Sequence, residues 1–393
     1  MLEIEERLAE LESRGLRRRL RLIEGPQGPE VFLDGDPVLL LCSNNYLGLA
    51  DDPRLRQAAA DAALGLGTGA GASRLISGSM SIHAELESRL AEFEGTEAAL
   101  LFGSGYLANT GTIAALAPRG EVVFSDELNH ASIIDGCRLA GAETFVYRHA
   151  DTEHLAWGLR RASGRASLIA TDGVFSMDGD VAPLSELAEL SRRHGCRLLV
   201  DEAHATGCLG PGGRGSVAAA RLSGDEDVVV VGTLGKALGG YGAYVCGTAE
   251  LVDYLVNSAR PFIFSTAPPP PVVAAARAAL ELLTEQPERV ERLRANAAAL
   301  REGLRSEGLQ PIGSETQIVP LVVGEADDAM ALCERLLAEG VFAQAIRPPT
   351  VPPGTCRLRL TAMATHRITD LRRAARLIGA AVRNRQPALR AAA

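Results

Sequence analysis

Residues 228–240 read VVVVGTLGKALGG, and residues 196–207 read CRLLVDEAHATG. In each stretch a short apolar run of branched side chains predicts a buried strand. A glycine-rich loop that carries Lys236 follows the first strand, and Asp201 ends the second. Ligands of open α/β sheets bind beyond the carboxyl ends of the strands. The two stretches therefore predict an amine and a carboxylate on one ligand-binding edge.

An amine and an anion at neighbouring strand ends suit pyridoxal phosphate, because the amine can form a Schiff base with it. A carboxylate beside the pyridine nitrogen favours the protonated form of the ring. Each residue also has an ordinary interpretation. Lys236 could be a solvated side chain at a strand end, and Asp201 could cap a helix. The candidates on other strands are what favour the cofactor.

Three further groups of polar residues follow other predicted strands. His130 lies in SDELNHASIIDG (125–136), where it is either a hydrogen-bonded loop histidine or a ring that stacks on a flat ligand. Gly105 and Tyr106 follow the strand predicted at 98–102 and open a helix, whose N-terminal amides can bind phosphate. The remaining candidates share loops with strand ends: Ser176, His204 and Thr233. A parallel sheet would gather all of them along one edge.

The glycines near residue 103 do not form a dinucleotide-binding fingerprint, because no third glycine follows in register. A nicotinamide-dependent dehydrogenase is therefore disfavoured. The other histidines have no comparable setting and are interpreted as structural: His83, His149, His154, His194 and His366.

The composition limits the possible classes of protein. The chain has 393 residues and a net charge of −9, which argues against a nucleic-acid surface. No apolar run is long enough for a membrane span, and the acidic N-terminus is unlike a signal peptide. Seven scattered cysteines without a CxxC pair predict neither a disulfide framework nor a zinc site, and suit a reducing cytoplasm. The basic run at 17–21 is either a solvated helix face or a contact to an anionic substrate.

Strands and helices alternate from about residue 50, which predicts an α/β fold. Seven strands are expected near 98–102, 122–125, 144–147, 168–171, 197–200, 228–231 and 242–246. Unbroken apolar strands of this kind predict a mostly parallel sheet covered by helices on both faces. Beyond the prolines at 268–271 the pattern predicts a smaller α+β domain, with helices at 272–284, 287–306, 327–339 and 369–384 and strands at 318–323 and 357–361.

Three regions are expected on this pattern: an N-terminal arm (1–43), a large α/β domain (44–285) and a small C-terminal domain (286–393). Within the arm we expect a helix over 1–24. A hairpin should follow it, with strands on either side of Asp34-Gly35.

The chain resembles the α-oxoamine synthase family of fold-type-I pyridoxal phosphate enzymes over nearly its whole length. The matching stretches are SNNYLGLA (43–50), GTGAGASRLISGS (67–79), LNHASIIDG (128–136), TDGVFSMDGD (171–180), LVDEAHATG (199–207), GRGS (213–216), GTLGKALGG (232–240) and RPPTVPPGTCRLRLT (347–361). Together they are specific to that family.

The resemblance implies a role for each matching residue, with Lys236, His130, Asp201 and His204 as the catalytic set and no metal. The resemblance implies that Lys236 forms the Schiff base, that Asp201 pairs with the pyridine nitrogen and that His130 stacks on the ring. Ser176 and His204 are implied contacts of the phenolate oxygen. The implied phosphate contacts are Gly105, Tyr106, Thr233 and the partner subunit's Thr266. The implied substrate contacts are His130, Asn44 and Arg359 for the amino acid and Arg18, Arg347 and Thr350 elsewhere on the substrates. A homodimer with a shared active site is also implied.

Within the family the chain is most similar to members that join L-alanine to a pimeloyl thioester, on CoA or a carrier protein, with loss of CO2 in biotin synthesis. RPFIFSTAPPP (260–270), Ala203 and the Gly-Gly-Tyr stretch at 239–241 favour them over glycine-using ligases. Glycine-using ligases and soluble serine-using palmitoyltransferases remain alternatives. A non-catalytic binding protein on the same scaffold is disfavoured by the intact set of Lys236, Asp201 and His130.

Overall fold

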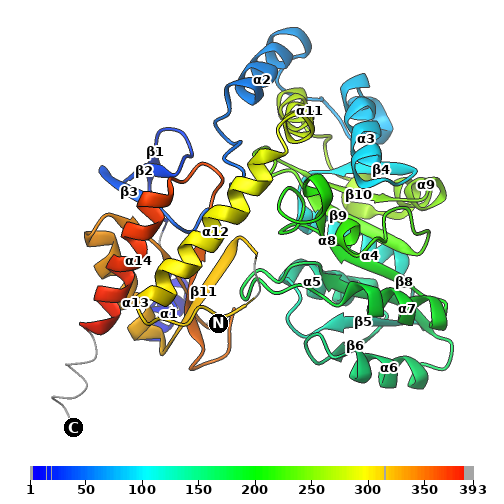
Figure 1. Ribbon diagram of the computed structural model, residues 1–393. Coiled ribbons are helices and arrows are strands. Elements are labelled where there is room, and N and C mark those ends of the chain that lie inside the picture. The colour runs from blue at the N-terminus through cyan, green and yellow to red at the C-terminus, as the bar shows by residue number, and fades with distance from the viewer. Residues whose placement is uncertain (1–2, 15, 19, 314–315, 385–393) are drawn as a thin grey trace.

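A computed structural model describes residues 3–384, apart from 15, 19, 314 and 315. The larger part is built on a seven-stranded sheet in the order β4-β10-β9-β8-β7-β5-β6 (Figure 1). Strand β10 is antiparallel to both of its neighbours, and the other strands run parallel. The strands are β4 (Ala98–Phe102), β5 (Val122–Asp126), β6 (Glu143–Tyr147), β7 (Ala166–Asp172), β8 (Arg197–Asp201), β9 (Val228–Thr233) and β10 (Ala243–Gly247). The predicted α/β fold with a mostly parallel seven-stranded sheet is confirmed.

The central strands are buried on both faces because their side chains alternate between two cores. Leu198, Val200 and Val230 belong to one core. Leu199 and Val229 belong to the core on the opposite face. Alternation along a strand points neighbouring side chains to opposite faces, so an unbroken apolar run fits a sheet covered on both sides.

Helices cover this sheet and project beyond it (Figure 1). They are α2 (Pro53–Leu66), α3 (Ser81–Glu94), α4 (Gly105–Leu116), α5 (Ala131–Ala140), α6 (Thr152–Arg161), α7 (Leu184–His194), α8 (Gly215–Ala219), α9 (Ala249–Ser258), α10 (Arg260–Ile263) and α11 (Pro270–Glu285). A π-helical turn, η1 (Arg74–Gly78), and a 3-10 turn, η2 (Pro211–Gly213), lie among them.

The smaller part has its own core and a three-stranded sheet in the order β11-β14-β13. Its elements are α12 (Glu288–Ser306), β11 (Ile318–Gly324), α13 (Ala326–Ala338), β12 (Val341–Phe342), β13 (Gln344–Ile346), β14 (Cys356–Thr361) and α14 (Ile368–Arg383). The short strands β12 and β13 were not expected from the sequence. They are only two and three residues long, so they carry little periodicity.

The N-terminal hairpin belongs to the same part of the molecule as the C-terminal elements. Strands β1 (Ile23–Glu24), β2 (Glu30–Leu33) and β3 (Asp36–Leu40) form a sheet in which β3 pairs in parallel with β12. Asp34 and Gly35 turn the hairpin with positive φ at both residues, as a tight two-residue turn requires. The hairpin is where the sequence predicted it.

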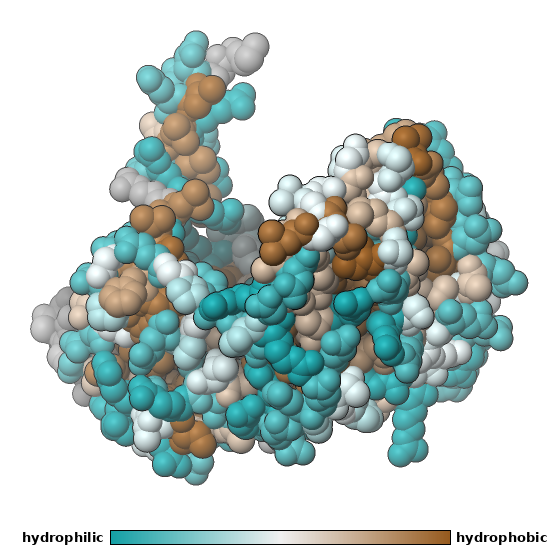
Figure 2. All heavy atoms as spheres, turned by 90° about the horizontal axis from the view of Figure 1, so that it is seen from above, coloured by the Kyte–Doolittle hydropathy of each residue, from teal (hydrophilic) through white to brown (hydrophobic). Residues whose placement is uncertain are grey.

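The helix expected over 1–24 is wrong in its length. Helix α1 covers only Ile4–Ser13, and β1 begins at Ile23. None of the residues of α1 is buried, so no tertiary packing stabilises a longer helix. Figure 2 shows this helix as an arm that stands clear of the body with an apolar stripe along it, formed by Ile4, Leu8 and Leu11.

Candidate active site

The carboxyl ends of five parallel strands bring the predicted residues to one edge of the sheet. Strands β4, β5, β7, β8 and β9 run in the same direction, because β10 alone is antiparallel. Each is followed by one or more of the predicted residues: Gly105 and Tyr106, His130, Ser176, Asp201 and His204, and Thr233 and Lys236. Parallel strand direction is therefore the structural cause of the cluster.

The loop of Lys236 is fixed by close backbone packing. Gly239 has a φ of +64°, and a side chain there would lie 2.5 Å from the backbone of Leu49 and Ala50. Glycine is required at such a contact. The Lys236 side chain reaches His204, with 2.9 Å between Nζ and Nε2. Lys236 is also the only lysine in the 393-residue sequence.

The Lys236 amine is poised to lose its proton near neutral pH. Burial lowers its pKa from 10.5 to about 8, because the charged form is poorly solvated. The carboxylate of Asp201 opposes this change, and the Arg359 guanidinium adds to it. A substantial share of the side chain is therefore neutral in mildly alkaline solution and able to act as a nucleophile or base.

Asp201 is held in a buried polar network at the end of β8. Its Oδ2 accepts a hydrogen bond from Asn109 Nδ2 at 2.6 Å, and its Oδ1 accepts one from the backbone of Ala203 at 2.9 Å. Asn109 also donates to Ser132, whose hydroxyl lies 2.8 Å from His130 Nδ1. The carboxylate and the predicted stacking histidine are thus linked through two neutral side chains.

Asp172 is a second carboxylate at this edge. It ends β7 in register with Asp201 on β8, and it accepts a hydrogen bond from the backbone of His130 at 2.7 Å. Burial and the neighbouring Asp201 carboxylate raise the pKa of Asp172 well above its usual range. Burial lowers the pKa of His130. Asp172 therefore favours its protonated form and His130 its neutral form.

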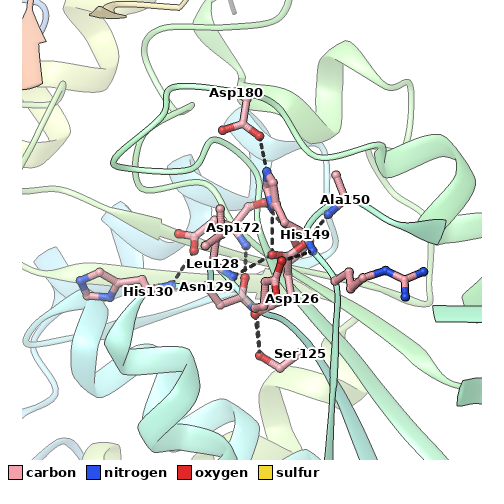
Figure 3. A network of polar contacts seen from close by, with 12 residues as sticks. Ser125, Asp126, Leu128, Asn129, His130, His149, Ala150, Asp172 and Asp180 are labelled. Carbon is pink, nitrogen blue, oxygen red and sulfur yellow. Dashed lines mark hydrogen bonds and ion pairs between the residues drawn. The ribbon is translucent and has the colours of Figure 1, made fainter. Parts of the chain in front are cut away.

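A wider network supports the turn that carries His130 (Figure 3). Asp126 accepts hydrogen bonds from the backbone of Leu128 at 2.9 Å and of Ala150 at 2.8 Å. His149 bridges Asp126 and Asp180, at 3.0 Å from Nδ1 and 2.7 Å from Nε2. The interpretation of His149 as structural agrees with these contacts.

This ion-paired histidine should stabilise the fold in a pH-dependent way. Its two carboxylate partners raise the pKa of His149 to about 10, above the ordinary 6.5. The stabilisation is therefore complete below about pH 6.5 and is lost as pH rises toward 10. We expect His149→Gln to reduce the free energy of unfolding by about 2–3 kcal/mol at pH 6 and by much less at pH 10, as measured by urea unfolding.

A matched control for this prediction is His194→Gln at the end of α7, which should change little at either pH. Among the described residues no ion pair involves His194. A loss in His149→Gln that is equal at pH 6 and pH 10 would contradict the charged state assigned to His149.

A cationic group faces the amine from the smaller part of the molecule. Arg359 on β14 donates to the backbone oxygen of Ser176, to Asn44 Oδ1 at 3.2 Å and to Tyr46 Oη at 3.1 Å. The Tyr46 hydroxyl also lies 2.6 Å from His204 Nδ1. Arg359 and Asn44, the predicted carboxylate contacts, are therefore joined to Lys236 by a continuous chain of hydrogen bonds.

The remaining predicted cofactor contacts lie at the rim of this site. Thr233 donates from its hydroxyl to the carbonyl of Gly242 and accepts from the amide of Gly235, both at 3.2 Å. Gly105 and Tyr106 open α4, so their amides belong to the first turn, where N–H groups have no intrahelical partner. Thr266 is exposed on a loop that pairs with Ser73.

The other predicted substrate contacts are Arg18, which the resemblance assigns to the acyl substrate, Arg347 and Thr350. Arg347 donates to the backbone oxygen of Arg17 at 3.4 Å, and the amide of Thr350 donates to the carbonyl of Arg347 at 3.2 Å. Arg18, the residue after Arg17, is exposed. Among the described residues, no hydrogen bond links Arg18 or Thr350 to Lys236 or His204.

Pyridoxal phosphate fits the residues that are present. Among the described residues, only neutral donors hydrogen-bond the buried Asp201 carboxylate, which therefore suits a cation such as a protonated pyridine nitrogen. A side chain added at Gly105 would meet nothing within 4 Å, so space lies open before the N-terminus of α4. A helix N-terminus of this kind binds phosphate.

Three residues of the site were missed by the sequence interpretation: Tyr46, Asn109 and Asp172. Asp172 carried the same signal as Asp201, since both are acidic residues that end an apolar strand. Tyr46 lies inside the SNNYLGLA motif, and Asn109 lies one helical turn after Gly105. Their polar partners come from distant parts of the sequence, so no local pattern marks them.

Comparison with known proteins agrees with this geometry. Residues 36–378 match the family described as aminotransferase class I and II. The chain belongs to the aminotransferase class I and II family. An 8-amino-7-oxononanoate synthase from Geobacter sulfurreducens is 56% identical over 371 residues, which cover 93% of this chain and 94% of that protein.

Two solved structures of α-oxoamine synthases share the fold. A serine palmitoyltransferase variant from S. paucimobilis with pyridoxal phosphate and myriocin bound has a TM-score of 0.91 and 34% identity, over 97% of each chain. An 8-amino-7-oxononanoate synthase from Francisella tularensis has a TM-score of 0.77 and 29% identity, over 89% of this chain and 99% of that one. The predicted family is confirmed, the chain is an enzyme of the acyltransferase type, and pyridoxal phosphate is confirmed as the cofactor of this family. None of the described helices could cross a membrane.

Proposed function

We propose that the protein condenses L-alanine with a pimeloyl thioester, on CoA or on a carrier protein, to give 8-amino-7-oxononanoate, CO2 and the free thiol in biotin synthesis. The observation that carries the proposal is the hydrogen-bonded chain from Lys236 through His204 and Tyr46 to Arg359. It places a cation for a carboxylate beside a reactive amine, as an α-amino acid requires. Relatives at 52–56% identity named 8-amino-7-oxononanoate synthase support the choice of reaction.

The chain's own groups provide binding and proton transfer for this reaction. When bound, pyridoxal phosphate supplies an electron sink for charge that develops at the amino-acid Cα. Arg359 and Asn44 bind the carboxylate of the amino acid. The neutral Lys236 amine removes the Cα proton, and its lowered pKa is what makes the neutral form available. Asp201 supplies the fixed negative charge that balances the cofactor ring.

The bonds made and broken define the products. A carbon–carbon bond forms between the amino-acid Cα and the thioester carbonyl, and the carbon–sulfur bond breaks to release the thiol. The bond from Cα to the carboxylate then breaks, CO2 leaves, and Cα receives a proton. In this proposal His130 would stack on the cofactor ring, and Ser176 and His204 would hydrogen-bond its phenolate oxygen. Gly105, Tyr106 and Thr233 would hold its phosphate.

We place the acyl thioester near the group formed by Arg18, Arg347 and Thr350. Arg18 lies on the N-terminal segment, and Arg347 and Thr350 lie on the loop before β14. The hydrogen bond from Arg347 to the backbone oxygen of Arg17 joins these two segments. The guanidinium groups of Arg18 and Arg347 suit the anionic parts of a CoA thioester and the distal carboxylate of a pimeloyl chain.

A homodimer is part of the proposal. Exposed apolar side chains gather where η1 and the loop after α10 meet: Leu75 (50% exposed), Ile76 (81%) and Phe264 (71%). The Ser73–Thr266 bridge brings the two segments together. Covering this patch with a second copy would carry the partner subunit's Thr266 toward the phosphate site. The seven cysteines are unpaired, which suits the cytoplasm.

The choice of amino acid is open to a direct test. Solved serine palmitoyltransferases share this fold at a TM-score of 0.91, so serine is a specific alternative, and glycine is the other. With pyridoxal phosphate and pimeloyl-CoA present, we expect thiol release with L-alanine to exceed that with glycine or L-serine by at least about tenfold in kcat/KM. Glycine lacks a methyl group, which changes binding in a fitted pocket by about 1–3 kcal/mol, and L-serine adds a hydroxyl group that such a pocket rejects by up to about 10²-fold.

The matched comparison repeats the three amino acids with acetyl-CoA and with palmitoyl-CoA in place of pimeloyl-CoA. A preference for glycine with acetyl-CoA, or for L-serine with palmitoyl-CoA, would replace the proposed reaction with one of the alternatives. No thiol release with any amino acid would remove the enzyme proposal.

A further inference from the structure

Tyr46 is a buried residue with no role in the steps above, yet its hydroxyl lies at the centre of the site. It is 0% exposed. Its hydroxyl accepts a hydrogen bond from Arg359 Nη2 at 3.1 Å and lies 3.0 Å from Asn44 Oδ1 and 2.6 Å from His204 Nδ1. One oxygen therefore touches both carboxylate-binding residues and the histidine next to Lys236.

We propose that Tyr46 is a positioning residue that orients Asn44 and Arg359 for a carboxylate and selects the tautomer of His204 that faces Lys236. The proposal rests on the proposed function only for the identity of the carboxylate, which is that of the amino-acid substrate. The tautomer of His204 is a property of the protein alone.

The carboxylate half of the proposal follows from counting donors. A guanidinium has five N–H groups, and Arg359 uses three of them on Ser176, Asn44 and Tyr46. Two N–H groups are left for a ligand. Asn44 Oδ1 accepts hydrogen bonds from both Tyr46 and Arg359, so the NH2 group of Asn44 points away from them. Among the described residues that NH2 group has no hydrogen-bond partner, so it is a third donor for a carboxylate.

The tautomer half follows from a single proton. The Tyr46 hydroxyl keeps its proton because burial raises its pKa, and it has two acceptors, His204 Nδ1 at 2.6 Å and Asn44 Oδ1 at 3.0 Å. The hydroxyl proton is therefore donated mainly to the nearer acceptor, His204 Nδ1. The hydrogen bond that Arg359 donates to the hydroxyl oxygen makes the hydroxyl a stronger donor. Burial and the cations of Lys236 and Arg359 lower the pKa of His204, so the ring is neutral.

A neutral His204 that accepts at Nδ1 carries its proton on Nε2. That N–H points at Lys236 Nζ, 2.9 Å away. A neutral amine can accept this hydrogen bond through its lone pair, whereas an ammonium group has no lone pair and cannot accept it. The tautomer therefore favours the neutral amine. The charged and titratable groups that act on Lys236 besides His204 are Asp201, Asp172, Arg359, Cys208 and His130. Tyr46→Phe leaves all of them in place.

The test uses the fact that Lys236 is the only lysine. Protein grown with [ε-13C]lysine gives a single side-chain resonance, so its pH titration needs no assignment. In cofactor-free Tyr46→Phe we expect the midpoint to lie about half a pH unit or more above that of the wild type. In the cofactor-loaded enzyme we expect KM for L-alanine to rise about tenfold, as for a lost hydrogen bond to a charged group, while KM for the thioester stays the same.

Tyr147→Phe is the control, since it removes one oxygen from another buried tyrosine, at the end of the edge strand β6. It should leave the midpoint and both KM values unchanged. If either the midpoint or KM for L-alanine in Tyr46→Phe stayed at the wild-type value, the proposal would be overturned. If the wild type did not use L-alanine, the proposed function would be contradicted. The titration of Lys236 would still test the role of Tyr46.

A second measurement does not depend on the folding of the variant. In wild-type protein labelled with [15N]histidine, the His204 signals are identified by their loss in His204→Asn. We expect the neutral ring to carry its proton on Nε2. A proton on Nδ1 would overturn the role assigned to Tyr46.

Discussion

Lys236→Ala should lower turnover by at least about 10³-fold, because the variant loses both the amine that attaches the cofactor and the base that removes the Cα proton. No other lysine exists in the chain to replace it. Borohydride reduction followed by mass spectrometry should show pyridoxal phosphate fixed to the peptide that contains Lys236 in the wild type and to no peptide in the variant.

Exogenous primary amines provide the control for this variant. Methylamine should restore part of the lost rate by acting as the missing base, which a misfolded protein would not permit. Wild-type turnover by Lys236→Ala, or cofactor fixed elsewhere in the wild type, would show that Lys236 does not have the assigned role.

Asp201→Asn should have the second largest effect, a loss of about 10²–10³-fold in kcat together with weaker retention of pyridoxal phosphate. An amide keeps the shape of the side chain and its contact with Asn109 but removes the negative charge. Without that charge the pKa of the pyridine nitrogen falls, so the ring is less often protonated and is a weaker electron sink. Steady-state rates and equilibrium dialysis of the cofactor measure the two effects.

Asp172→Asn is the matched control, because it alters the carboxyl group next to Asp201 in the same register. Burial and the Asp201 charge already favour the protonated form of Asp172, so the amide removes little charge. Its loss of rate should be far smaller than that of Asp201→Asn. Equal losses in the two variants would mean that general disruption, and not the charge at Asp201, causes the effect.

The strands were predictable because strands buried on both faces appear in the sequence as unbroken apolar runs. All seven strands of the main sheet lie within two residues of their expected bounds. Lys236 and Asp201 could then be placed on one edge, since parallel strands bring their carboxyl ends together. The N-terminal helix was extended too far because an amphipathic pattern does not show whether its apolar face has a partner.

The connections inside the site could not be predicted in the same way. Tyr46 is 158 residues from His204 and 313 residues from Arg359, so no local pattern relates them. His149 is separated from Asp126 by 23 residues and from Asp180 by 31. Such pairs are set by the packing of elements that are distant in the sequence, and sequence periodicity reports only on single elements.

The central claim is that this site forms a carbon–carbon bond and releases the amino-acid carboxylate as CO2. The most direct measurement is the yield of labelled CO2 and of free thiol from L-alanine labelled with 13C at C1, pimeloyl-CoA and the cofactor-loaded enzyme. We expect one labelled CO2 for each thiol released, with the other carbons of alanine retained in 8-amino-7-oxononanoate. Thiol release without labelled CO2 would contradict it, because the site would then be hydrolysing or transferring the acyl group without decarboxylation.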